Sequence, residues 1–161
     1  MENDSQINNA QAFHALDQYF FLSVEESSPD AAFDWIYMMH DEDWHLLTEA
    51  WKVRPPEWRE SCAYILGEGP TLEGFPLLRQ ALFDENLNVA VQAACAITSQ
   101  RNYLNELVDM DEFVNPDEFV DLDEEIVSRL ENIVILSESE YMEDVIELIH
   151  LLRNPPDRSI S

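Results

Sequence analysis

The sequence predicts an all-α protein of about eight short helices that pack as antiparallel pairs. Apolar residues recur at spacings of three and four along most of the chain, and no stretch alternates polar and apolar residues as a strand would. Only three glycines occur in 161 residues, all between Gly67 and Gly74. Prolines and small polar residues mark the boundaries between the periodic segments, as is typical of helix ends.

The first three helices follow from these patterns. Residues 10–22 carry apolar side chains on one helical face. Ser28 is a capping residue, and Pro29 lacks the N–H group that a first helical turn leaves unpaired, so a helix is expected over 29–39. The acidic residues 41–43 begin the third helix, because carboxylates are favoured at a helix N-terminus.

The next two helices are bounded by prolines. Pro55 and Pro56 end the third helix and start a fourth over 56–66, whose apolar residues form one stripe. A fifth helix is expected over 74–84. Its Pro76 should lie in the first turn, because a proline inside a helix removes a backbone hydrogen bond.

The following segment is predicted as a helix, a short helical piece and a helical start. Asn86 or Asn88 caps a helix that reaches residue 99. Residues 103–108 form a separate short helical segment. Asn115, which precedes a proline, starts a further helical stretch.

The last two helices are expected over 121–135 and 139–152, where apolar residues again recur at three and four. Ser137 and Glu140 have the spacing of a capping box and should open the second of them. Asn154, followed by two prolines, ends it.

An internal repeat indicates how these helices are arranged. Residues 58–66 align with residues 89–97 at an offset of 31. Each segment begins with a large apolar residue, has small residues four and five positions later, and ends on apolar residues. Repeats with a period of 20–50 residues are typical of stacked helical units, so we expect an α-solenoid-like stack.

Several residues within 56–99 follow a known pattern: Arg59, Ala63, Leu66, Gly67, the start Pro76-Leu77-Leu78 and the end Ala81-Leu82-x-Asp84. On these residues the segment resembles HEAT repeats of the short kind found in bilin-lyase-like proteins. Ala90 departs from the pattern, which usually has Arg at that position. The resemblance implies a HEAT-like scaffold that binds proteins.

Charge is the most unusual property of the chain. Its 34 Asp and Glu residues against 8 Lys and Arg give a formal charge of −26. Such a charge argues against direct binding of nucleic acid and of an anionic membrane surface, because like charges repel. With 46% hydrophobic residues the chain can bury a core, so it is not a disordered acidic tail.

The acidic residues lie mainly at the two ends of the chain. Residues 1–50 contain no Lys or Arg, whereas residues 51–104 contain six acidic and five basic residues. We therefore expect one helical domain with four parts: acidic N-terminal helices at 10–55, a HEAT-like core at 56–99, acidic C-terminal helices at 105–152 and a tail at 153–161.

Residues 105–147, the C-terminal acidic segment, contain 16 acidic residues and one base, and the sequence Asp-Glu-Phe-Val occurs in them twice. Either both phenylalanines pack into the core, or they anchor a basic protein partner that the acids attract. The predicted partner-binding residues are Asp109, Asp111, Glu112, Phe113, Asp117, Glu118, Phe119, Asp121, Asp123, Glu124 and Glu125, with Asp41, Glu42, Asp43 and Trp44 as a second, N-terminal acidic patch.

The sequence offers little for catalysis. His40 and His45 are five residues apart, which does not place two metal ligands on one helix face, and no window matches a calcium loop or a phosphate-binding loop. We expect no enzymatic activity, no cofactor and no metal. Cys62 and Cys95 are interpreted as reduced core residues. With no secretory signal and no membrane-length apolar run, the predicted location is cytoplasmic.

The function that best fits these observations is an immunity or inhibitor protein that covers the cleft of a basic, nuclease-type toxin. Opposite charges would speed the capture of such a toxin. Two alternatives remain: a nucleic-acid mimic that blocks DNA-binding proteins, and a HEAT-like adaptor or chaperone scaffold.

Overall fold

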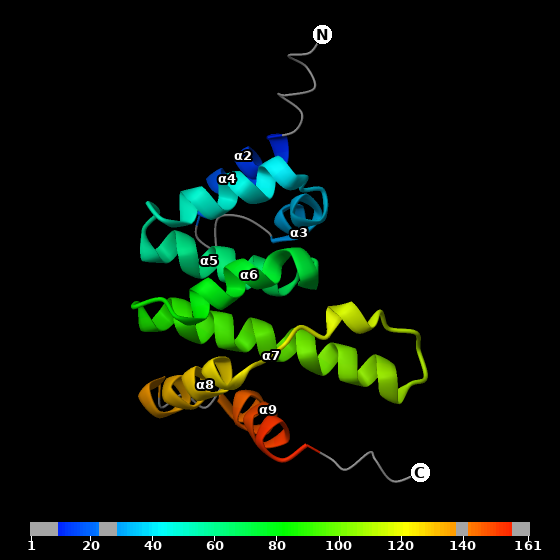
Figure 1. Cartoon of the computed structure of the whole chain (residues 1–161). Coiled ribbons are helices and arrows are strands. Elements are labelled where there is room, and N and C mark those ends of the chain that lie inside the picture. The colour runs from blue at the N-terminus through cyan, green and yellow to red at the C-terminus, as the bar shows by residue number, and fades with distance from the viewer. Residues whose placement is uncertain (1–9, 23–28, 138–141, 156–161) are drawn as a thin grey trace.

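The computed structural model describes residues 10–22, 29–137 and 142–155 and confirms the all-α prediction. These ranges contain eight α-helices, one 3-10 helix and no strand. The helices pack in contacting pairs and form a stack from α2, α3 and α4 at one end to α8 and α9 at the other (Figure 1). Their bounds are α2 Gln11–Tyr19, α3 Asp30–Tyr37, α4 Asp41–Trp51, α5 Pro56–Gly67, α6 Thr71–Leu82, α7 Leu87–Asp109, η1 Pro116–Glu118, α8 Glu124–Ser137 and α9 Glu143–Arg153.

The centre of the stack is formed by α5, α6 and α7, which all pack on one another. Small residues of the predicted repeat, among them Ala63 and Ala93, are completely buried and allow these helices to approach closely. Gly67 has the same role at the end of α5, because a Cβ atom there would lie 2.6 Å from the Cβ of Ala96. Large side chains such as Leu78 fill the remaining space, each stabilising the fold by about 1.5–3 kcal/mol.

An aromatic cluster joins the N-terminal helices to this centre. The Trp58 ring on α5 is fully buried and lies edge-on to Phe20, with 5.1 Å between the ring centroids. Trp51 of α4 packs on the same indole at 6.2 Å. The Trp58 Nε1–H group donates to Asp17 Oδ1 over 3.0 Å, so the buried indole has a partner for its one polar group.

Helix α7 corrects one sequence prediction. The helix expected to end at residue 99 and the separate segment 103–108 are one continuous helix of 23 residues. The intervening residues include no glycine or proline, and Leu104 continues the buried face of the helix. Nothing in the sequence therefore breaks the helix, and the packing of its buried face stabilises the additional turns.

Helix α6 corrects a second sequence prediction. It begins at Thr71 rather than at residue 74, so Pro76 lies inside the helix and not in its first turn. Pro76 is exposed, which places the interrupted hydrogen bond on the side of the helix that water reaches. Pro70, in an extended conformation, precedes the helix and explains the earlier start.

The C-terminal helices start later than predicted. Asp123 caps α8, because its Oδ1 accepts a hydrogen bond of 2.9 Å from the Ile126 N–H group, so α8 begins at Glu124 and not at residue 121. Ser137 ends α8 and does not open α9, which begins at Glu143. Glu140 of the predicted capping box and Ser28 of the predicted N-terminal cap lie outside the described residues. The helical stretch expected at Asn115 is the 3-10 turn η1.

Candidate binding surface

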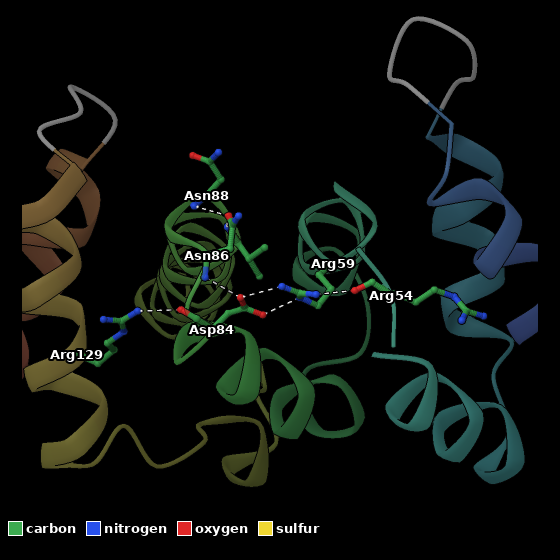
Figure 2. A network of polar contacts seen from close by, with 7 residues as sticks. Arg54, Arg59, Asp84, Asn86, Asn88 and Arg129 are labelled. Atoms are coloured by element: carbon green, nitrogen blue, oxygen red, sulfur yellow. Dashed lines mark hydrogen bonds and ion pairs between the residues drawn. The ribbon is translucent and has the colours of Figure 1, made fainter. Parts of the chain in front are cut away.

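A polar network holds the helix ends together on one side of the stack (Figure 2). Asp84, in the turn between α6 and α7, receives two hydrogen bonds from Arg59 of α5, at 2.8 Å and 3.1 Å. Arg59 also donates to the Arg54 carbonyl. The carboxylate of Asp84 accepts a further bond of 2.9 Å from the Asn86 N–H group, and Asn86 caps α7 through its own side chain. These contacts fix α5, α6 and α7, the three helices of the predicted repeat core, in one arrangement.

Helix α8 is attached to the same turn. The Arg129 guanidinium donates to the carbonyl oxygen of Asp84 over 3.1 Å (Figure 2). It also donates to the carbonyl oxygen of Leu82 over 2.8 Å. These carbonyls lie where α6 ends and have no helical donor, so the arginine satisfies them. The C-terminal acidic segment is thereby anchored to the repeat core.

All seven Lys and Arg side chains of the described residues are engaged by groups of the chain itself. Besides Arg59 and Arg129, they are Lys52 with Glu49, Arg54 with Asp17, Arg79 with Asp123 and Glu125, Arg101 with the Val120 carbonyl, and Arg153 with Glu124 and Glu131. The described residues contain many more carboxylates than these seven cations, so most of the carboxylates form no ion pair within this part of the structure.

The predicted acidic residues of the C-terminal acidic segment divide into two groups, according to whether they form an ion pair. Asp123, Glu124 and Glu125 lie at the start of α8 and pair with Arg79 or Arg153. The others form no ion pair in the described parts of the chain, and most of them are exposed to solvent. This unpaired group comprises Asp109, Asp111, Glu112, Asp117, Glu118 and Asp121.

The two phenylalanines of the repeated Asp-Glu-Phe-Val sequence have different environments. Phe113 is 89% exposed, so its ring projects from the loop that follows α7. Phe119 is half-buried beneath Arg101, whose guanidinium lies 5.5 Å from the ring centroid. Arg101 also donates to the Val120 carbonyl and thus clamps the loop onto α7. Phe119 is therefore a structural anchor, and Phe113 is the aromatic residue that a partner can reach.

The loop that carries Phe113 begins with a defined turn. Asp111 has a φ of 61°, the left-handed conformation that commonly ends a helix. The Asp111 N–H group donates to the Val108 carbonyl over 3.0 Å, and the Glu112 N–H group donates to the Leu107 carbonyl over 2.9 Å. This pair of bonds is a Schellman motif, which fixes the direction of the loop relative to α7.

The N-terminal acidic patch requires a correction at Asp43. This side chain is completely buried, and its two oxygens accept bonds of 2.9 Å from the N–H groups of Phe13 and His40. Asp43 thus joins α2 to the start of α4 and is not available to a partner. Asp41 and Glu42 are exposed, as predicted, whereas Trp44 is half-buried against the core.

A cavity of about 560 Å³ is lined in part by Glu118 of the C-terminal acidic segment. It lies between the end of α3, the turn between α5 and α6, η1 and α7. We call it the acidic pocket and define it by five of its lining residues: Tyr37, Glu68, Glu73, Tyr103 and Glu118. Of these, only Glu118 belongs to the predicted binding set. The other four residues are far apart in the sequence. The group of three glycines between Gly67 and Gly74 is the one sequence feature noted above that lies near them.

The acidic pocket is electrostatically negative. Partial burial raises the pKa of Tyr37, and the negative charges of Glu68 and Glu118, together with Tyr103, raise it further. These groups are therefore close enough to influence one another. No Lys, Arg or His lines the pocket.

Neither thiol has the environment of a nucleophile. Cys62 and Cys95 are free, as predicted, and burial raises the pKa of both thiols, that of Cys62 most strongly. Among residues 10–22, 29–137 and 142–155, no group of three His, Cys, Asp or Glu side chains is placed to hold a metal ion.

Comparison with protein-family models, with curated proteins and with solved structures finds no match to this chain. The resemblance of residues 56–99 to HEAT repeats accordingly stays a prediction. None of the described helices combines the length and the apolar character needed to cross a membrane.

Proposed function

We propose that this protein is a non-enzymatic binding protein for a basic protein, and specifically an immunity or inhibitor protein that neutralises a nuclease-type toxin. The observation that carries the proposal is the charge imbalance of the surface. Every described Lys and Arg side chain is used internally, while the unpaired carboxylates surround an exposed phenylalanine. A basic partner would supply the missing counter-charge.

The loop around Phe113 suits such a partner because it is held in place before binding. The Schellman motif fixes its start, and the contact between Arg101 and Phe119 fixes its end. A preordered loop loses little conformational entropy on binding. The carboxylates would steer a basic protein toward the surface, and Phe113 would fill an apolar recess of that protein.

The first experiment is capture of partners by the immobilised full chain at low and at high salt. We expect a basic protein whose association rate falls steeply as the salt concentration rises. The nuclease activity of the captured partner is then measured with and without the chain, and inhibition is expected. A neutral or acidic partner, or an association rate that is indifferent to salt, would contradict the proposal. Capture of many unrelated DNA-binding proteins would indicate a nucleic-acid mimic instead.

Variants of the exposed carboxylates and of Phe113 test where the basic partner binds. Neutralising Asp109, Asp111, Glu112 and Asp117 to Asn or Gln should lower the association rate at low salt by about tenfold or more. Asn is chosen for Asp111 because it also tolerates the left-handed conformation.

The matched control for this set neutralises four carboxylates outside the C-terminal acidic segment: Asp34, Glu57 and Glu85, which are exposed, and Glu60, which is half-buried. It makes the same change in net charge, so a local binding surface should leave it with a much smaller effect. Equal losses in the two variants would show that only the total charge matters.

Phe113→Ala tests the aromatic anchor. A phenylalanine at the centre of an interface contributes about 2 kcal/mol or more, so the Kd should rise about 30-fold. The control is Ile135→Ala, because Ile135 is an apolar side chain on α8 that is also highly exposed, at 74%. An unchanged Kd for Phe113→Ala would move the binding surface elsewhere on the protein.

A further inference from the structure

We propose that the acidic pocket binds the guanidinium group of an arginine side chain that the basic partner presents. This inference rests on the proposed function, because it names the part of the basic partner that the protein recognises. The pocket supplies three things that such a group needs: space, negative charge and aromatic faces.

The size of the cavity suits an inserted side chain. Its volume of about 560 Å³ lies within the range of about 300–1,000 Å³ found for binding pockets. An extended arginine side chain fits into this volume together with some water.

The carboxylates of the pocket come from three different elements. Glu68 lies in the α5–α6 turn, Glu73 lies in the first turn of α6, and Glu118 ends η1. None of them forms an ion pair in the part of the chain that the structure describes. Arg101 does not line this cavity; it lines a small neighbouring cavity with Glu118 and is engaged with Phe119 and the Val120 carbonyl. The three carboxylates thus line a cavity whose lining includes no Lys, Arg or His.

The aromatic side chains decide between arginine and lysine. Tyr37 from α3 and Tyr103 from α7 both line the pocket, and both are more than 60% exposed. A planar guanidinium stacks on aromatic faces and forms two parallel hydrogen bonds to a carboxylate. A lysine ammonium is a strongly hydrated point charge that forms neither the stacked nor the bidentate contact. The combination of tyrosine rings and carboxylates therefore favours arginine.

The floor of the pocket is closely packed against two helices. Gly67 contacts Ala96 of α7 so closely that a Cβ atom would clash, and Gly69 packs on Ile36 of α3, where a Cβ atom would lie 2.8 Å from the Ile36 side chain. The turn is thus fixed between two helices. Gln100 also donates a hydrogen bond of 3.2 Å to the Leu66 carbonyl. A preformed site of this kind binds its ligand without first ordering its walls.

The test is an NMR titration of the full-length, 15N-labelled chain with acetyl-arginine-methylamide, and with the corresponding lysine compound. We expect chemical-shift changes centred on the amides of residues 67–71 and 99–104. The arginine compound should bind at least about threefold more tightly than the lysine compound, because only arginine can stack and bind bidentately. Shifts spread evenly over all acidic surfaces, or equal affinity for the two compounds, would overturn the inference.

A charge-matched pair of variants makes the test specific. Glu68→Gln combined with Glu118→Gln should weaken arginine binding about tenfold or more, since two charge-assisted bonds are lost. Glu57→Gln combined with Glu85→Gln removes the same charge from two exposed positions that neither line the pocket nor belong to the predicted binding residues, and should change the affinity less than about twofold. Equal weakening in both variants would mean that the compound senses only net charge, and would overturn the inference. The amide spectrum of each variant shows whether it has remained folded.

The same variants separate this inference from the proposed function. If the captured basic partner binds the Glu68→Gln/Glu118→Gln variant with an unchanged Kd, the pocket inference fails while the proposed function stands. If the arginine compound binds in the pocket but no basic protein is captured, the proposed function fails while the guanidinium specificity of the pocket stands.

Discussion

Replacing Asp84 by Ala tests whether the network in the α6–α7 turn holds the repeat core together. The Asp84 side chain is 7% exposed and its partner Arg59 is 15% exposed, so water screens this pair poorly. The substitution removes two charge-assisted bonds to Arg59 and the bond from the Asn86 N–H group. It also leaves the guanidinium of Arg59 without its counter-ion.

The expected loss is about 3 kcal/mol in the free energy of unfolding. Removing one partner of a fully buried pair costs about 3–5 kcal/mol, and the lower end applies because Arg59 keeps its bond to the Arg54 carbonyl. For a protein of this size, such a loss lowers the Tm by about 6–12 °C. Urea unfolding followed by circular dichroism measures the change, provided that the m-value is unchanged.

A double-mutant cycle with Arg59→Met isolates the interaction. If the two side chains stabilise the fold through each other, the double variant is less destabilised than the sum of the single variants. Glu49→Ala is the control, because its pair with Lys52 is more than half exposed and should be worth less than about 1 kcal/mol. A loss below about 1 kcal/mol for Asp84→Ala, or additive effects of the two substitutions, would refute the reasoning.

Three further predictions concern the contact between Gly67 and Ala96 and the two cysteines. Gly67→Ala should destabilise the fold by about 1–2 kcal/mol, because the clash with Ala96 outweighs the gain in helix propensity. Adding Ala96→Gly to the same chain should recover part of this loss. Urea unfolding measures both changes. With a chromogenic thiol reagent, Cys95 should react slowly and Cys62 only on unfolding, and equally fast reaction of both would contradict their placement. Burial in the folded state disfavours the thiolate and raises the pKa of Cys62 well above its ordinary value of 9.0. The neutral Cys62 thiol therefore makes its full contribution to the free energy of unfolding below pH 9.0, and this contribution is lost as the pH rises above that value.

Secondary structure was largely predictable because it depends on local patterns. The helix starts at Asp41 and Pro56 were predicted correctly from a run of acids and from a pair of prolines. The small residues of the repeat were expected to be buried at helix contacts, and Ala63 and Ala93 are. Helix ends were less predictable: α7 continues past residue 99 because Leu104 finds a place in the core.

The candidate site was predictable only as an acidic region. The sequence could not distinguish Phe113 from Phe119, since both occur in the same four residues, and their difference arises from Arg101 on another element. Nor could it show that Asp43 is buried, because the donors that satisfy its carboxylate include the backbone of Phe13, thirty residues earlier.

The sequence by itself determined that the chain is helical, that residues 58–66 and 89–97 share a pattern at an offset of 31, and that its ends carry a large excess of acid. These properties follow from composition and from spacing along the chain. Only the tertiary structure decided which acids are paired, which phenylalanine is exposed, and that Tyr37, Glu68 and Glu118 line one cavity. The reason is physical: charge pairing and burial depend on which helices meet, and residues far apart in sequence meet only in the folded stack.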